Sequence, residues 1–286
     1  MSTKSNSTSC FDLVSRYKGL VRIGQGAFGS VFVGEDVKTN SKRALKVIKF
    51  NNYEDLNTSM KEGSNLMNIK HENILRVTDF FVDPKDQVLC IEMDFYEHGD
   101  LLTFSTSNVV YSEKLVRGII YQLCDALNFI HTNLNIIHRD IKPSNIFLKE
   151  FDPNNDKVHV VLADFGLAKH NQGSVNNSYA GTPLFMSPEL GLGGKYDSST
   201  DIYSLGVSIY QILTKDVVTS ISQLYLYQDV GEVQEKLRNE INTKSDHKYS
   251  SELVETVLSM LEKDPRKRPT AKQIMDIMAN DLIVMG

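Results

Sequence analysis

The sequence has 286 residues, of which 41% are hydrophobic and 23% are charged, and its formal net charge at pH 7 is −5. This composition is typical of a globular protein, and the negative charge argues against a broad nucleic-acid-binding surface. No apolar run approaches the roughly 18 residues of a membrane-spanning helix, and the three distant cysteines are too few for a disulfide scaffold. We therefore expect one bilobal unit or two modest domains, in the cytoplasm or nucleus, with neither nucleic acid nor a membrane as a partner.

The first hundred residues predict a small sheet with one helix. A polar, Ser/Thr/Asn-rich stretch over 1–16 is expected to be a disordered leader. After it, short β-type runs alternate with glycines, and one segment has apolar residues at loose helical spacing. The strands are expected over 19–23, 30–33, 43–49 and 87–93, and the helix over 53–69.

The remainder of the chain is predicted to be mainly helical. Apolar residues recur at helical spacing in three long segments, and Ser112 is a suitable N-cap for the first of them. One strand is expected at 158–162. The helices are expected over 112–131, 201–213 and 251–262, with a further charged helical piece that ends near residue 241.

A G-x-G-x-x-G pattern is formed by Gly24, Gly26 and Gly29. The pattern alone is a weak signal, because dinucleotide-binding folds and phosphate-binding hairpins share it and an ordinary glycine hairpin also fits it. In a dinucleotide-binding fold the glycines open a helix, whereas residues 30–33 here continue as a strand. We therefore expect a hairpin whose turn places backbone N–H groups over phosphates.

Lys46 lies on the strand after this hairpin, and its ammonium group is predicted to point toward the phosphates. A buried lysine needs an anionic partner, and Glu62 on the following helix is the candidate. Gly63 costs that helix about 1 kcal/mol relative to alanine, so we expect the Lys46–Glu62 pair to form only intermittently in the unphosphorylated protein. Taken alone, either residue would more often be a solvated surface residue.

Two further motifs carry the candidate catalytic residues. His138 to Asn145 reads His-Arg-Asp-Ile-Lys-Pro-Ser-Asn, and Asp164-Phe-Gly follows a predicted strand. Asp140 is suited to accept the proton of an attacking hydroxyl, and Lys142 to neutralise a migrating phosphoryl group. Asn145 and Asp164 offer the oxygen ligands that Mg²⁺ prefers. A loop with fortuitous carboxylates is the competing interpretation, but two chance matches in this order are improbable.

With these motifs, the chain resembles the eukaryotic protein kinase superfamily, serine/threonine type, over residues 17–283. The resemblance implies an α+β, bilobal protein kinase fold, with a small antiparallel β-sheet lobe that carries one regulatory helix (17–96) and a larger, mainly helical lobe (97–283). It also implies that ATP binds with Mg²⁺ in the cleft between the lobes. The motifs are loosely similar to those of NIMA-related kinases and, less strongly, to those of the kinases of translation initiation factor two.

The same resemblance assigns the nucleotide-binding residues. Met93 corresponds to the gatekeeper, and Asp94 to Tyr96 correspond to the hinge whose backbone bonds adenine. Asp100 corresponds to a polar residue near the ribose. The residues implied to contact the nucleotide are Ile23, Gly24, Gly26, Gly29, Val31, Ala44, Lys46, Met93, Asp94, Tyr96, Asp100 and Phe147.

The substrate class is indicated by the catalytic loop and by the segment that follows it. Lys142, two residues after the catalytic aspartate, is the pattern of serine/threonine kinases, and Thr182 is implied to bridge these two residues. Two structural roles are implied as well. Glu189 is expected to pair with Arg268, and Asp201 to accept backbone N–H groups of the catalytic loop.

The stretch 214–250 departs from the family pattern, because it lacks the Gly-x-x-Pro-Phe sequence that many kinases carry there. Substrate docking commonly uses this region, so the resemblance implies nothing about how substrates are recognised. Tyr225 and Tyr227 fit either a partner surface or buried packing, and packing is our expectation.

Three functions compete on these observations. An active serine/threonine kinase would act on protein substrates that bear Ser or Thr and would be switched by an upstream kinase or by self-phosphorylation. A pseudokinase, serving as an ATP-binding scaffold, normally lacks one of Lys46, Asp140, Asn145 or Asp164, and all four are present. A nucleotide-binding oxidoreductase would need an acidic residue after a parallel strand, and none occurs in the expected place.

The segment from 164 to 189 resembles a kinase activation segment with a polar middle. Ser178 resembles an activating phosphosite, and Arg139 is suited to receive its phosphate through charge-assisted hydrogen bonds. An unmodified, solvated serine is the competing interpretation.

We predict that Ser178→Ala lowers the rate of phosphoryl transfer by about tenfold or more, because the segment loses at least one charge-assisted hydrogen bond. Steady-state rates before and after treatment with a phosphatase measure the effect, and Ser174→Ala in the same segment is the control. A Ser178→Ala protein as active as the parent would rule out the switch.

Overall fold

The structure is a computed structural model and describes residues 16–26, 29–52, 56, 60, 67–83, 87–105, 109–165, 169–170, 181–216, 220–245 and 248–284. These residues fall into two compact units, one formed by residues up to 71 and 75–95, the other by 72–74 and residues from 96 onward. The predicted lobe boundary after residue 96 lies one residue from this division. Within the described ranges, no helix has both the length and the apolar character needed to cross a membrane.

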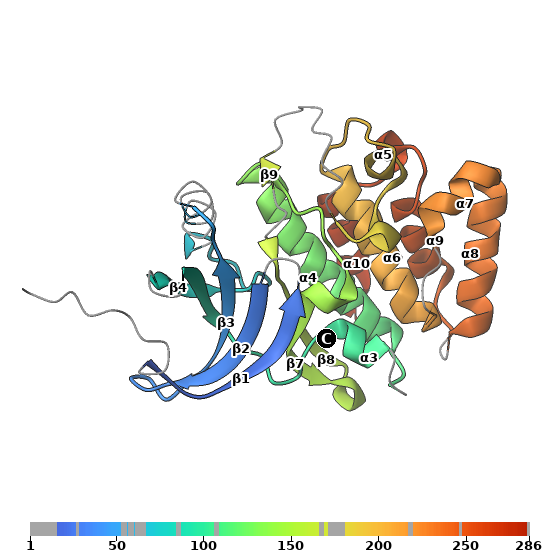
Figure 1. The fold of residues 1–286 in the computed structure, drawn as a ribbon. Coiled ribbons are helices and arrows are strands. Elements are labelled where there is room, and N and C mark those ends of the chain that lie inside the picture. Colours follow the sequence, from blue (N-terminus) through green and yellow to red (C-terminus); the bar gives the residue numbers. More distant parts are fainter. Residues whose placement is uncertain are drawn as a thin grey trace, which may run out of the picture. The chain divides into compact units, whose positions relative to one another are not determined.

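The first unit contains a five-stranded antiparallel sheet with the strand order β1-β2-β3-β5-β4 (Figure 1). Four strands were predicted from the alternation of apolar residues with turn signals. β4 was missed because its consecutive Phe-Phe-Val residues do not alternate with polar ones. The strands are β1 (Tyr17–Gly26), β2 (Gly29–Asp36), β3 (Lys42–Lys49), β4 (Val77–Asp83) and β5 (Val88–Asp94).

Apolar residues from the predicted helix pack against this sheet. Leu56 and Met60 are helical and join a core cluster with Leu89 and Ile91 of β5. Burial of this apolar surface stabilises the unit. Glu62 and the glycine after it lie outside the described residues.

The second unit is mainly helical, as predicted. Its longest helix, α4, begins where the Ser112 side chain accepts the N–H of Leu115 at 3.1 Å, which confirms the predicted N-cap. Counterparts of all four predicted helical segments are present, whereas α3, α5, α7 and α10 were not predicted. The helices are α3 (Leu101–Ser105), α4 (Glu113–Thr132), α5 (Pro188–Gly191), α6 (Ser199–Thr214), α7 (Ile221–Tyr227), α8 (Val230–Lys244), α9 (Ser251–Met260) and α10 (Ala271–Val284).

Short strands hold both ends of the catalytic loop. β6 (Ile136–Ile137) pairs with β9 (Lys169–His170) immediately before the loop, and β7 (Ile146–Asp152) begins immediately after it. β7 pairs in turn with β8 (Lys157–Leu162), which ends just before the Asp-Phe-Gly motif. The two ladders therefore fix where the loop starts and where it ends.

The helix α6 forms the centre of the second unit, and every residue from Thr200 to Thr214 is buried. It contacts α4, α8 and α9. A Cβ at Gly206 would lie 2.9 Å from the Cβ of Met260, so glycine is what allows α9 to approach α6 this closely.

The two tyrosines of α7 have different environments. Tyr225 is buried, and its hydroxyl donates to the carbonyl oxygen of Leu261 at 2.6 Å, which confirms the expectation of packing. Tyr227 is 85% exposed, so the expectation was wrong for this residue. Two positions along a helix turn the side chain by about 200°, which places the two rings on opposite faces.

A buried carboxylate connects three strands of the first unit. Glu92 on β5 accepts hydrogen bonds from Arg16 Nη2 at 2.7 Å, from Thr78 Oγ1 at 2.6 Å and from the Tyr17 hydroxyl. Arg16, which the prediction placed in the leader, also donates to Asp79 at 2.7 Å. These hydrogen bonds, which are strengthened by burial of the carboxylate, connect the start of β1 to β4 and β5.

We predict that Tyr17→Phe lowers the free energy of unfolding by about 2 kcal/mol, because a buried hydrogen bond to a carboxylate is lost. Urea unfolding followed by circular dichroism measures the change. Tyr227→Phe removes the same atom from an exposed ring and should leave stability nearly unchanged. Equal stability of the two variants would show that the Tyr17–Glu92 bond contributes nothing.

Candidate active site

Asp140, Lys142 and Thr182 form a hydrogen-bonded group in the second unit. Lys142 Nζ donates to Asp140 Oδ2 and to Thr182 Oγ1, each at 2.8 Å, and Thr182 Oγ1 donates to Asp140 Oδ1 at 3.0 Å. The predicted bridge through Thr182 is therefore present. Because a cation and a hydroxyl hold both of its oxygens, the carboxylate has a fixed orientation beside a positive charge.

Asn145 is directed at the same carboxylate. Its Nδ2 donates to the Asp140 carbonyl oxygen at 2.7 Å and to Asp140 Oδ2 at 3.0 Å. The amide oxygen is then the atom of Asn145 that can ligate a cation. Asp164 adopts a left-handed backbone with φ of 62°, a conformation that non-glycine residues adopt at a cost and that recurs at functional sites. An amide oxygen and a carboxylate suit Mg²⁺.

His138 links the catalytic loop to the Asp-Phe-Gly motif. Its Nδ1 accepts the N–H of Asp140 at 3.3 Å, and its Nε2 lies 3.0 Å from the carbonyl oxygen of Ala163. Burial lowers the pKa of His138, so the ring is neutral and carries its hydrogen on Nε2. The ring also packs against Phe165 with the centroids 4.7 Å apart. The buried ring of His138 therefore connects the catalytic loop to the Asp-Phe-Gly motif.

Asp201 on α6 holds the backbone of the catalytic loop. Its carboxylate accepts the N–H groups of His138 and Arg139, both at 2.8 Å, as the resemblance implied. His131 Nε2, which was not predicted, lies 2.8 Å from Asp201 Oδ2. Burial alone would raise the pKa of Asp201, but the hydrogen bonds that its carboxylate accepts and the two neighbouring histidines together lower that pKa. Arg139 has φ of 68°, so the carboxylate stabilises a left-handed turn.

Arg268 anchors the end of the segment that contains Thr182. Its Nη1 and Nη2 donate to the two carboxylate oxygens of Glu189 at 2.7 and 2.8 Å, which confirms the predicted pair. The guanidinium also lies 4.9 Å from the ring centre of Tyr203 on α6. The Arg268 side chain is fully buried. A bidentate buried pair of this kind fixes geometry as well as charge.

Arg139 has a partner that the sequence did not reveal. Its Nη1 donates to the Tyr196 hydroxyl at 3.2 Å, and its guanidinium lies 6.0 Å from the centre of that ring. Ser178 lies outside the described residues. The role of Arg139 as a phosphate receptor therefore stays a prediction.

The glycine pattern lies in a hairpin of the first unit. Gly24 lies opposite Val31 and Gly26 opposite Gly29 in the β1–β2 register, while the two residues between the strands lie outside the described part of the chain. Gly29 has φ of 137°, and a Cβ there would lie 2.1 Å from the carbonyl oxygen of Val47. Only glycine fits this position. Because a strand and not a helix follows, the dinucleotide-binding alternative fails.

Four predicted nucleotide-binding residues share one face of the sheet. Val31 lies opposite Lys46, and Ala44 lies opposite Met93. Ala44 and Lys46 are two residues apart on β3, so their side chains point to the same side. The register therefore brings these four residues together, whereas Glu62, the proposed partner of Lys46, lies outside the described residues.

The other predicted nucleotide-binding residues are divided between the units. In the first unit, Ile23 is 53% exposed and Asp94 forms an ion pair with Arg43. In the second unit, the backbone of Asp100 forms an isolated antiparallel β-bridge with Phe147. The Asp100 side chain accepts hydrogen bonds from the N–H and the hydroxyl of the third residue after it, so it caps α3. Tyr96, the last residue of the predicted hinge, begins the longer of the two segments that make up the second unit.

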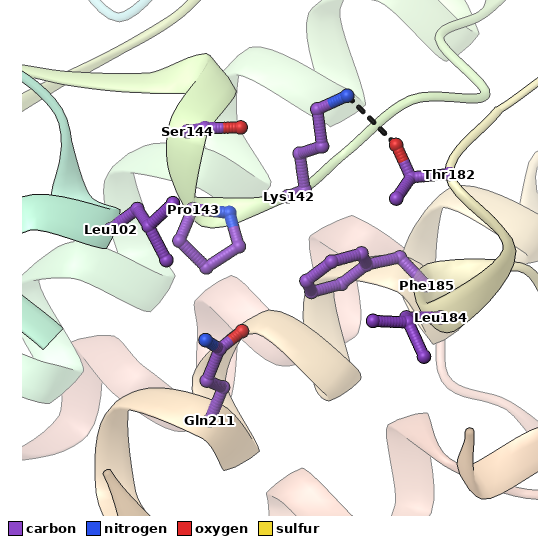
Figure 2. A pocket seen from close by; sticks show the side chains of 8 residues that line it. All are labelled: Leu102, Lys142, Pro143, Ser144, Thr182, Leu184, Phe185 and Gln211. Carbon is purple, nitrogen blue, oxygen red and sulfur yellow. Dashed lines mark hydrogen bonds between the residues drawn. The ribbon is translucent and has the colours of Figure 1, made fainter. Parts of the chain in front are cut away.

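A pocket of about 290 Å³ adjoins the catalytic group (Figure 2). Lys142 and Thr182 form one side, and Gln211 of α6 lies across from them. Leu102 and Phe185 add apolar walls. The sequence offered no signal for this pocket, because its residues come from α3, the catalytic loop, the segment after Thr182 and α6.

Comparisons with known proteins identify the family. The family model described as "Protein kinase domain" matches residues 17–278. Ovarian-specific serine/threonine-protein kinase Lok of Drosophila melanogaster is 34% identical over 206 residues, with 68% of this chain and 42% of that protein covered. Serine/threonine-protein kinase 33 of Bos taurus is 33% identical over 268 residues (89% and 53% covered). Probable serine/threonine-protein kinase nek1 of Dictyostelium discoideum is 31% identical over 277 residues (89% and 54% covered). The chain thus spans about half the length of these relatives.

We predict that Arg268→Gln lowers the free energy of unfolding by about 3–5 kcal/mol, because Glu189, whose side chain is only 13% exposed, loses its cation. Arg266→Gln is the matched control, since Arg266 is 87% exposed and its pair with Asp264 is solvated. Chemical denaturation of both variants checks the difference. Similar losses at the two sites would contradict an anchoring role for Arg268.

Proposed function

This chain belongs to the protein kinase domain family, and we propose that it is a serine/threonine protein kinase that transfers the γ-phosphoryl group of ATP to protein hydroxyls. The observation that carries the proposal is the group of Asp140, Lys142 and Thr182, in which a carboxylate is held by a cation and a hydroxyl. Phosphoryl transfer depends mainly on positioning and charge, which is what such a group supplies.

The catalytic loop supports a defined role for each side chain. Asp140 orients the substrate hydroxyl and accepts its proton as the oxygen bonds to the γ-phosphorus and the bond from that phosphorus to the ADP oxygen breaks. Lys142, 2.8 Å from Asp140, places its positive charge near the migrating group. Thr182 fixes the relative position of the two, so its segment must be in place before the loop can act.

The donor atoms support binding of ATP with Mg²⁺. The amide oxygen of Asn145 and the carboxylate of Asp164 are hard oxygen ligands, and they would hold the ion together with phosphate oxygens. When bound, Mg²⁺ would neutralise part of the negative charge of the phosphates. On the first unit, Lys46 shares a sheet face with Val31 and Ala44, an arrangement that suits an apolar base and an anionic phosphate.

The cysteines support a location in the cytoplasm or nucleus, as the sequence led us to expect. Cys90 and Cys124 are buried free thiols. Burial raises the pKa of Cys90 to about 12, so it stays an unreactive thiol. Reducing compartments keep such thiols free.

We predict that the chain, preincubated with Mg²⁺-ATP, transfers labelled phosphate to serine or threonine of a generic protein substrate. Asp140→Asn should lower the rate at least about 100-fold, because the proton acceptor is lost. Lys46→Met should also abolish transfer, whereas Asp276→Asn, on the exposed side of α10, should not. Transfer rates and mass spectrometry of the modified residues provide the measurement.

ATP binding without transfer by the wild type would favour the scaffold alternative. Phosphotyrosine as the product would contradict the proposed substrate class. Equal rates for the wild type and Asp140→Asn would contradict the role of the catalytic loop.

A further inference from the structure

The pocket beside the catalytic group is placed to meet a substrate residue that neighbours the phosphorylated one. Lys142 and Thr182 both line it, and each is hydrogen-bonded to Asp140. An extended peptide advances about 3.3 Å per residue. A peptide whose hydroxyl reaches Asp140 therefore carries a flanking side chain to this pocket, an inference that rests on the proposed function.

The walls of the pocket are apolar and partly uncovered. Leu102 on α3 and Leu184, two residues after Thr182, are each 38% exposed. Phe185 lies beside Leu184 in the pocket wall (Figure 2). A substrate side chain that covers this surface gains hydrophobic stabilisation.

The charges around the pocket disfavour a basic side chain. None of the described residues that line it is acidic, and its charged member, Lys142, already donates to Asp140 and Thr182. A lysine or arginine in the pocket would lose water, gain no carboxylate from the lining and approach the ammonium of Lys142. Burying a cation on these terms is costly.

Gln211 supplies an unused hydrogen-bond acceptor. The residue is 8% exposed, and its Oε1 is buried and accepts no hydrogen bond from the described residues. Figure 2 shows its amide end directed toward the space between Pro143 and Phe185. A buried acceptor without a donor is unfavourable, and a bound peptide would relieve that cost by donating to it.

We propose that this pocket selects substrates by taking an uncharged side chain that flanks the phosphorylated serine or threonine, while the same peptide donates a hydrogen bond to Gln211 Oε1. The apolar part of that side chain covers Leu102, Leu184 and Phe185. Lysine and arginine are rejected at this position. Gln211 determines specificity and takes no part in the transfer chemistry.

The test uses the full chain and serine peptides that carry Leu, Gln, Ala or Arg at one flanking position at a time. For the wild type, one position should show a kcat/KM at least about tenfold higher with Leu than with Arg. Gln211→Glu places a carboxylate in the pocket and should reverse the preference toward Arg at that same position. Gln223→Glu, the same change at an exposed position of α7, should leave the preference as it is.

Two further variants separate the effect of charge in the pocket from the effect of the Gln211 hydrogen-bond acceptor. Leu102→Glu should also shift the position toward Arg, and its partly exposed site lets the new carboxylate remain hydrated if Gln211→Glu fails to fold. Gln211→Met keeps the size but removes the acceptor. It should raise KM for the Leu peptide about fivefold or more with little change in kcat, a split that a merely structural role would not produce.

Two outcomes would overturn the inference and leave the proposed function standing. One is a wild type that phosphorylates Leu and Arg peptides equally at every position. The other is that folded Gln211→Glu, or Leu102→Glu in its place, keeps the wild-type preference. A wild type that phosphorylates no peptide and no protein would overturn the proposed function and this inference with it.

Discussion

A buried carboxylate at the start of α6 determines the shape of the catalytic loop. Asp201 accepts the N–H groups of His138 and Arg139, and Arg139 is thereby held in a left-handed conformation that side chains other than glycine rarely adopt. The next residue is Asp140, whose direction follows from that turn. Without the two hydrogen bonds, the loop would relax to an ordinary conformation and Asp140 would point elsewhere.

The same helix organises the segment that faces the loop. Near its start, the carbonyl of Ser199 accepts a hydrogen bond from Arg268, which holds Glu189. One turn on, Ser204 Oγ donates to the carbonyl oxygen of Phe185 at 2.8 Å. Hydrogen bonds from α6 therefore hold both the loop that contains Asp140 and the segment that contains Thr182. A fully buried helix suits this role, because packing on all sides leaves it little freedom to shift.

The sequence predicted which side chains of the catalytic loop lie together, because phosphoryl transfer requires particular side chains at fixed spacing within short loops. The family resemblance added the pairs Glu189–Arg268 and Asp201 with the loop. It could not reveal Tyr196 or the pocket at Gln211, because an ordinary tyrosine and an ordinary helical glutamine gain their roles only through long-range packing. For the fold, local patterns gave four of the five strands of the sheet and the main helices. They could not separate buried Tyr225 from exposed Tyr227, since that depends on which face of α7 meets the core.

Asp201 and Gln211 lie ten residues apart on one rigid helix, a separation of about 15 Å. One end of α6 shapes the catalytic loop, while the other end faces the pocket that we propose to receive a neighbouring part of a peptide substrate. On this proposal, a mutation near residue 211 changes which peptides bind and leaves the catalytic loop undisturbed. Under the proposed function, such a division gives the protein evolvability: new substrates are acquired in single steps while the reaction itself is inherited intact.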